Sequence, residues 1–325
     1  MPTSKSTLQN DSLEDLALGL CWGAWTELGV SGWRRTHQDW AIDPEPLIVF
    51  TAWMRDDDRR LRDESLDWCI HYWRHVSKVR LKNLPNRDLE DDLHEAWGEY
   101  AATVNARAHV AWPRPTHALE RYQATGRSAL RQLTEPSLVC LRMRAMFGLG
   151  ARCEIMRQLL FQGKRWMTVA QLAGATAYAK RNVADECDTL ERAGVLAMRA
   201  ESNRFYYSLA HPDALADFVG DLPTIRPDWR ALFDLLRWLI DLERQAEKLS
   251  DEVLHVEMHT TLREIEDDLD ALGFDGPGRT SALDYRDTFL PWAERLLSDL
   301  AAGTWPSAET KTSRAQRPVK AATWS

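Results

Sequence analysis

Apolar residues recur at helical spacing along most of this 325-residue chain. The densest group of signals lies between Leu149 and Leu209. Its first part has apolar residues three and four positions apart and ends at Gly163, which predicts a helix with a glycine C-cap. Thr168 follows, with Gln171 three residues later at capping-box spacing, and this pair predicts a second, short helix.

A longer helix is predicted over residues 178–192, because Val183, Cys187 and Leu190 are spaced by four and three residues. A glycine two residues later ends this helix. Two β-prone runs around a polar turn then predict a hairpin over residues 195–209. The order is therefore three helices followed by a hairpin.

Three helices and a hairpin in this order resemble the winged helix-turn-helix of bacterial transcriptional regulators of the MarR and ArsR kind. The resemblance covers only residues 149–209, about a fifth of the chain. It implies that the helix over 178–192 enters the major groove of duplex DNA. It also implies that the hairpin over 195–209 is a wing that reaches an adjacent groove or the backbone.

Candidate DNA contacts lie at the start of the longer helix and around the tip of the wing. They are Tyr178, Lys180, Arg181, Asn182, Arg199, Asn203 and Arg204. Arginine and asparagine side chains can each make two hydrogen bonds with guanine and adenine edges. Arginines that flank a wing tip are natural phosphate contacts, which position a protein without reading sequence.

The distribution of charge favours the same interpretation. Eleven Lys and Arg against six Asp and Glu give residues 137–210 a net charge of +5, although the whole chain carries −8. Basic charge concentrated in one domain is expected of a DNA-binding protein. Asp185 and Asp188 count against this interpretation because carboxylates repel phosphate, and Ala179 provides no side-chain cap for the helix.

The flanking regions read as separate helical parts. Residues 11–112 form a Trp-rich α-helical domain, since nine of the fifteen tryptophans precede Pro113. Helices are predicted over 13–28, from Pro44, over 61–76 and over 89–106. A leading helix over 117–133 opens the central domain, 117–210. Residues 1–10 and the basic tail 304–325 are predicted to be disordered.

The C-terminal region, 228–303, carries a heptad-like apolar seam. Its positions alternate spacings of four and three along one predicted helix: Leu235, Leu239, Leu242, Ala246, Leu249, Val253 and Val256. Such a narrow stripe needs a partner, either other helices of the same chain or the same helix of a second subunit. We expect a homodimer through Leu235, Leu239, Leu242, Leu249 and Val253.

Two groups of residues carry candidate chemistry outside the central domain. His37 and Asp39 lie in a loop with two arginines and could act on a phosphate, although a loop packed by its tryptophans is favoured. Asp63, Asp67, His71 and His75 form one line along a helix, which is typical of a solvated face. His255 and His259 are one turn apart without a marked third ligand. The five cysteines show no disulfide or zinc pattern.

The sequence therefore predicts a mainly α protein in three parts, with a central winged helix that binds double-stranded DNA as a homodimer. Its expected task is transcriptional regulation, with repression as the expected sign. No cofactor or metal is expected, and no enzyme motif is present. No stretch of the chain is apolar and long enough to cross a membrane, and we expect a cytoplasmic protein.

Two other functions stay open. In the first, the acidic N-terminal domain binds a protein partner, and the winged helix serves as the scaffold of a protein-interaction or antitoxin-like adaptor. In the second, His37 and Asp39 belong to a phosphate-cleaving enzyme.

Overall fold

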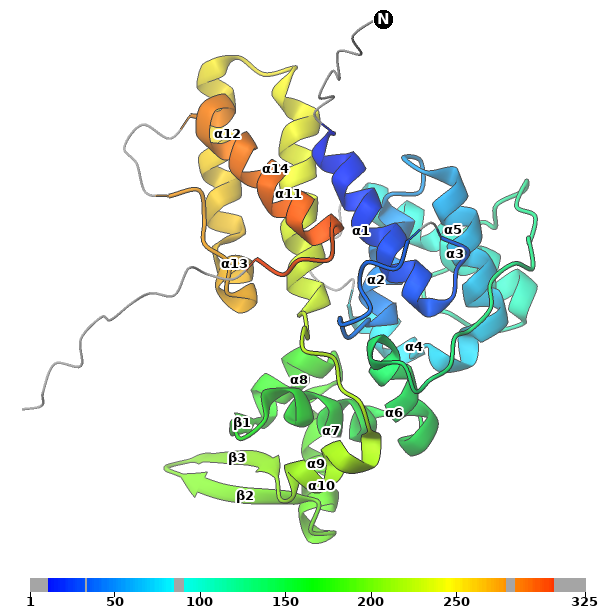
Figure 1. The fold of residues 1–325 in the computed structure, drawn as a ribbon, viewed down its shortest axis with the longest axis vertical. Coiled ribbons are helices and arrows are strands. Elements are labelled where there is room, and N and C mark those ends of the chain that lie inside the picture. Colours follow the sequence, from blue (N-terminus) through cyan, green and yellow to red (C-terminus); the bar gives the residue numbers. More distant parts are fainter. Residues whose placement is uncertain (1–10, 33, 85–90, 279–283, 307–325) are drawn as a thin grey trace, which may run out of the picture.

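The computed structural model describes residues 11–306 except 33, 85–90 and 279–283. These residues form fourteen α-helices and one small three-stranded antiparallel sheet, so the protein is mainly helical (Figure 1). Within the described ranges, no helix has the length and apolar character that crossing a bilayer requires. Residues 1–10 and most of the predicted tail, 307–325, lie outside the described residues.

Two hydrophobic clusters organise the chain. The larger one is built by helices from both ends of the sequence: α1 (Leu13–Leu28), α2 (Pro44–Trp53), α3 (Arg59–Tyr72), α4 (Lys78–Asn83), α5 (Asp91–Ala108), α11 (Trp229–Ala246), α12 (Asp251–Glu264), α13 (Glu266–Leu272) and α14 (Leu290–Ala301). The predicted N-terminal and C-terminal regions therefore share one core and are not separate domains.

The smaller cluster lies in the middle of the chain, at the bottom of Figure 1. It is built by α6 (Val139–Phe147), α7 (Ala151–Gln162), α8 (Val169–Thr176), α9 (Lys180–Arg192) and α10 (Pro212–Val219), with strands β1 (Met167–Thr168), β2 (Leu196–Glu201) and β3 (Arg204–Leu209). Helix α6 contributes apolar residues to both clusters and so packs against each of them.

Helix α1 has the limits that the sequence predicts. Ser12 and Asp15 form a reciprocal capping box at its start. Gly29 ends it with φ of 103°, a backbone conformation that favours glycine. A Cβ at this position would meet the carbonyl oxygen of Ala129, so the close approach of a second segment also requires glycine here.

That second segment corrects the predicted leading helix over 117–133. These residues form an extended strap that runs over the N-terminal helices. Its backbone donors find partners in distant segments: Gly126 and Ser128 donate to the Asp67 carboxylate, and Ala129 donates to the carbonyl of Gly29. Asp67 is fully buried, so its assignment to a solvated face is wrong. Its carboxylate fixes the strap instead.

The prediction that one continuous C-terminal helix carries the apolar seam is also wrong. Helix α11 ends at Ala246, and Ser250 caps a new helix, α12, which folds back beside α11 (Figure 1). Leu235, Leu239 and Leu242 are buried inside the larger cluster, and Leu249 packs against it from the outside. Leu235, Leu239 and Leu242 are therefore already covered within one chain and offer no surface for a second subunit. Val253, which is 44% exposed, lies on the separate helix.

Six buried charged side chains join the two clusters. They are Asp43 and Glu45 at the start of α2, Arg80 in α4, Arg144 in α6, and Glu154 and Arg157 in α7. Their ion pairs are short: Arg80 to Asp43 at 2.5 Å, Arg144 to Glu45 at 2.7 Å and to Glu154 at 2.8 Å, Arg157 to Glu154 at 2.6 Å and to Asp43 at 3.2 Å. We call this set the buried ion network.

The arginines decide how the acids of this network titrate. Burial opposes ionisation of Asp43, but Arg80, Arg157 and Arg144 outweigh it and hold the pKa of Asp43 well below its usual range. At Glu154 burial is again outweighed, and the pKa falls to about 2. Burial prevails at Glu45 and raises its pKa.

Replacement of Arg144 by alanine is expected to destabilise the protein by about 3 to 5 kcal/mol, because Glu45 and Glu154 would stay buried without their shared cation. Denaturant unfolding measures this change. The control is Arg152→Ala, which removes an exposed pair with Glu186 and should cost less than about 1 kcal/mol. Equal losses in the two variants would contradict a special role for the network.

Acid should weaken the joint between the clusters. Carboxyl groups of the unfolded chain titrate near pH 4. Because the pKa values of Asp43 and Glu154 are lower than this in the folded protein, both groups contribute stability above about pH 4. This contribution is lost as the pH falls toward their pKa values in the folded protein. Glu45 acts in the opposite direction and offsets part of the loss. Urea unfolding between pH 7 and pH 2.5 tests this expectation. Glu154→Gln should show a shallower decline below pH 4 than the wild type does.

Candidate nucleic-acid interface

Helices α7, α8 and α9 and the three-stranded sheet form the candidate interface. Strand β1 follows α7 and pairs with β3, which pairs with β2, so the strand order is β1-β3-β2. Thr168 ends β1 and caps α8 through the predicted capping box with Gln171. The two-residue strand β1 has no counterpart in the sequence analysis, because two residues are too few to show an alternation.

Helix α9 places its apolar side chains as predicted. Val183, Cys187 and Leu190 are buried, while Lys180, Arg181 and Asn182 are exposed in the first turn. The three candidate contacts are therefore adjacent in space as well as in sequence. Main-chain donors of this first turn have no side-chain cap, as expected from Ala179.

Tyr178 does not belong to this exposed group. It precedes the helix, is only 7% exposed, and its hydroxyl lies 2.9 Å from the hydroxyl of Ser77. Its assignment as a DNA contact is wrong, since its ring is buried in the smaller cluster and its hydroxyl is hydrogen-bonded to Ser77. Burial also raises the pKa of this phenol.

Helix α4 holds the turn between α8 and α9. Ala177 lies in the left-handed region at φ of 56°, and its carbonyl accepts a hydrogen bond from Asn83 at 2.8 Å. The carbonyl of Thr176 accepts from Arg80 at 3.2 Å. Because Arg80 also belongs to the buried ion network, the start of α9 is fixed to the body of the protein. No pattern in the sequence connects Arg80 or Asn83 with residue 177.

The charge on α9 is nearly balanced. Three basic residues stand against four acidic ones in this helix. Glu186 pairs with Arg152 at 2.9 Å, and Asp188 accepts a hydrogen bond from Tyr207 at 3.3 Å. The net charge of +5 over residues 137–210 overstates the basic surface. Three of its arginines are buried: Arg142, Arg144 and Arg157.

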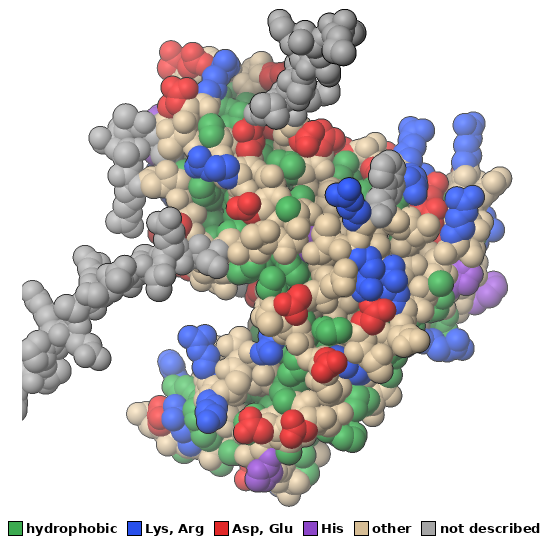
Figure 2. All heavy atoms as spheres, in the orientation of Figure 1, with side chains coloured by type: hydrophobic (Ala, Val, Ile, Leu, Met, Phe, Trp, Pro, Cys, Tyr) green, Lys and Arg blue, Asp and Glu red, His purple; other side chains and the backbone are tan. Residues whose placement is uncertain are grey.

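The exposed basic side chains gather on the sheet. Arg199 of β2 lies over the rings of Trp166 and Tyr206, at 4.7 and 5.4 Å, and pairs with Glu201 at 3.3 Å. Arg204 is exposed in the opposite strand. Figure 2 shows blue basic groups around the hairpin at the lower left of the molecule. The two-residue turn between the strands carries Asn203, which is also exposed.

His37 and Asp39 do not form a catalytic pair. The His37 ring is buried, with Nε2 at 2.9 Å from the carbonyl oxygen of Leu300 and Nδ1 at 2.8 Å from the Thr36 hydroxyl. Burial lowers the pKa of His37 to about 4. Asp39 accepts from the backbone N–H of Thr224 and so ties the loop to the segment after α10. Both side chains serve the fold.

One cluster has donors at metal-binding separation. Oxygen and nitrogen atoms of Glu95, Glu99 and His117 lie within 4.8 Å of one another. Glu99 already pairs with His117 at 2.6 Å and with Arg55 at 3.3 Å. A guanidinium this close opposes a cation, so the contacts fit an ion-pair cluster better than a metal centre.

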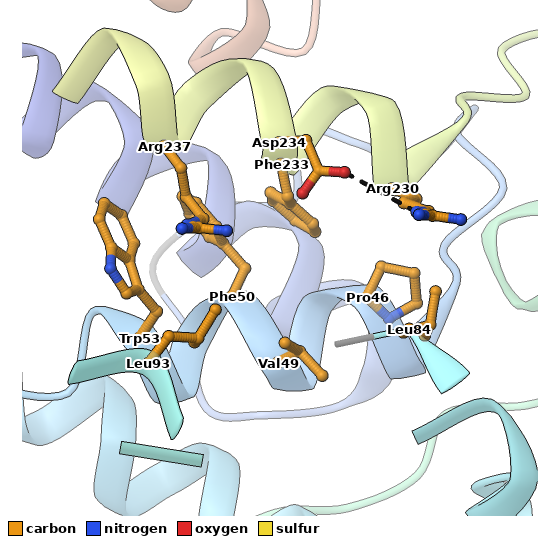
Figure 3. A pocket seen from close by; sticks show the side chains of 10 residues that line it. All are labelled: Pro46, Val49, Phe50, Trp53, Leu84, Leu93, Arg230, Phe233, Asp234 and Arg237. Carbon is orange, nitrogen blue, oxygen red and sulfur yellow. Dashed lines mark ion pairs between the residues drawn. The ribbon is translucent and has the colours of Figure 1, made fainter. Parts of the chain in front are cut away.

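Two cavities lie against α2. The first, between α2 and α11, has a volume of about 50 Å³ and is walled by apolar side chains such as Phe50 and Phe233 (Figure 3). This is well below the roughly 150 Å³ that holds a benzene ring. The second, of about 180 Å³, touches Arg80 and Arg157, whose guanidinium groups are paired within the buried ion network. Arg237 also lines the first cavity, with its guanidinium 5.7 Å from the centre of the Trp53 ring.

Tyr178→Phe separates structural loss from loss of DNA contact. Removal of one neutral buried hydrogen bond should lower the free energy of unfolding by about 0.5 to 1.5 kcal/mol. Affinity for duplex DNA, measured well below the melting temperature, should not change. A variant that unfolds normally but binds DNA more weakly would restore Tyr178 to the interface.

Comparisons of this chain with models of known protein families, with curated proteins and with solved structures find no match. The resemblance to winged-helix regulators therefore rests on its own residues. Any inference about function therefore starts from the geometry of the segment from α7 to β3.

Proposed function

We propose that this protein binds double-stranded DNA through a winged helix-turn-helix formed by residues 151–209 and thereby regulates transcription. The order helix, short strand, helix, helix and hairpin supports this proposal, because it is the order of elements in that motif. In this arrangement α9 is the recognition helix and β2–β3 is the wing.

The observation that carries the proposal is the first turn of α9. Lys180, Arg181 and Asn182 are all exposed there, while the helix buries the opposite face against α7 and α8. The start of a recognition helix is the part that reaches base edges in helix-turn-helix proteins. Arg181 and Asn182 carry the two side-chain types that can discriminate guanine and adenine.

The distribution of tryptophan favours DNA binding over the adaptor. An aromatic docking surface on the N-terminal region would require exposed rings. Five of its tryptophans are instead almost fully buried: Trp25, Trp40, Trp68, Trp97 and Trp112. These rings build the larger core, and they are not available to a protein partner.

Binding of the purified protein to the DNA upstream of its own gene, against a scrambled duplex of equal length, tests the proposal. Fluorescence anisotropy at two salt concentrations gives both affinity and charge contribution. Arg181→Gln and Asn182→Ala should each cost about 1 to 3 kcal/mol on the preferred duplex, because each removes a base contact. The titration also gives the number of chains per site.

Lys248→Gln is the matched control. Lys248 is exposed in the turn between α11 and α12, at the opposite end of the molecule from the wing (Figure 1). Its replacement should leave affinity unchanged. Equal affinity of the wild type for both duplexes, lost at the higher salt, would mean nonspecific attraction and would contradict regulation at a specific site.

A further inference from the structure

The outer part of the hairpin has an apolar face that nothing in the described chain covers. Phe205 in β3 is 56% exposed and Met198 in β2 is 43% exposed. Solvent exposure of a phenylalanine and a methionine on one small hairpin is costly in water, because each leaves apolar surface unburied. Such a face points to a partner that covers it.

The strand register places these two side chains on the same face. Leu196 pairs with Leu209, Met198 with Tyr207, and Ala200 with Phe205, so each of these pairs projects to one side of the sheet. The innermost pair is buried in the smaller cluster. The face then continues outward beyond the cluster, and the small side chain of Ala200 leaves the Phe205 ring uncovered.

The charges of the sheet point to the chemistry of the partner. Four exposed basic side chains lie here, Lys164 and Arg165 just before β1, Arg199 in β2 and Arg204 in β3, and Glu201 is the one acid among the residues of the sheet and this leading segment. Arg199 and Arg204 project from the face opposite Phe205, while Tyr207 on the apolar face donates to Asp188 of α9. Helix α9 has more acids than bases. The sheet is therefore the part of the proposed interface that best complements a polyanion, as the blue groups in Figure 2 show.

We propose that the wing provides most of the binding energy for DNA and that Phe205 inserts against a base step in the minor groove. Arg204, next to Phe205 and on the other face, contacts a flanking phosphate. Apolar side chains that wedge between bases, with basic residues beside them, are a known mode of minor-groove binding. Stacking contacts of this kind do not depend on charge.

This inference rests on the proposed function, and the experiment separates the two. Affinity of the wild type, Phe205→Ala, Arg204→Gln and Arg181→Gln for one duplex is measured across a range of salt concentrations. Phe205→Ala should weaken binding about 10-fold and leave the salt slope unchanged, because no charge is lost. Arg204→Gln should lower that slope by about 0.9. On a scrambled duplex, Arg181→Gln should weaken binding less than Phe205→Ala does.

Phe218→Ala is the matched control. Phe218 in α10 is 66% exposed and packs beside Phe147, so it is an equally accessible phenylalanine outside the sheet. Its removal should not change DNA affinity.

A duplex with 2-aminopurine at successive steps should show unstacking by the wild type and none by Phe205→Ala.

Three outcomes count against the inference or its basis. Absence of DNA binding by the wild type would overturn the proposed function itself. Wild-type DNA binding that Phe205→Ala leaves unchanged would overturn only the role of the wing. Loss of self-association in Phe205→Ala, with DNA affinity unchanged, would show that the apolar face meets a second copy of the chain.

Discussion

Three acidic and three basic side chains lie away from water where the two hydrophobic clusters meet, and the arrangement of the molecule depends on their pairing. Transfer of each charge from water into a protein interior costs several kcal/mol after relaxation. The cost is offset only where every carboxylate has an arginine within bonding distance, as between Arg144 and Glu154. Three acids and three arginines leave no net charge behind. A displacement of α7 from α2 would separate these partners, so the network selects one arrangement of the clusters.

The same network reaches the proposed DNA-binding surface. Arg80 pairs with Asp43 and also donates to the carbonyl of Thr176 in the turn before α9. Asn83, three residues further along α4, donates to the carbonyl of the next residue, Ala177. The orientation of α9 is therefore set by the body as much as by its own small core. Helices far apart in sequence contribute to that body, which explains why the two ends of the chain must fold together.

Local signals in the sequence predicted local structure well. The capping box at Thr168 and the apolar face of α9 lie where their spacing places them, and α1 has its predicted limits. Long-range choices were not predictable in this way. The strap over 117–133 has residues compatible with a helix, but Asp67 and Gly29 provide partners for its backbone that no neighbouring residue announces. A heptad spacing likewise continues through the turn after Ala246, because spacing does not record where a helix reverses direction.

For the candidate site, the sequence predicted which residues are exposed better than it predicted the balance of acidic and basic charge on the surface. Counting charges along the chain placed the basic surface over the whole central region, since a count cannot distinguish Arg157, buried in the network, from Arg204 at the wing tip. Once the buried arginines are excluded from the count, α9 carries more acidic than basic residues, and its acids repel a phosphate backbone. The excess of basic over acidic residues then lies on the sheet and the segment that leads into it. In the proposed mode of binding, α9 can read bases only if another element holds the duplex against it. The β2–β3 hairpin, with exposed arginines and an uncovered apolar face, is the element placed to do so.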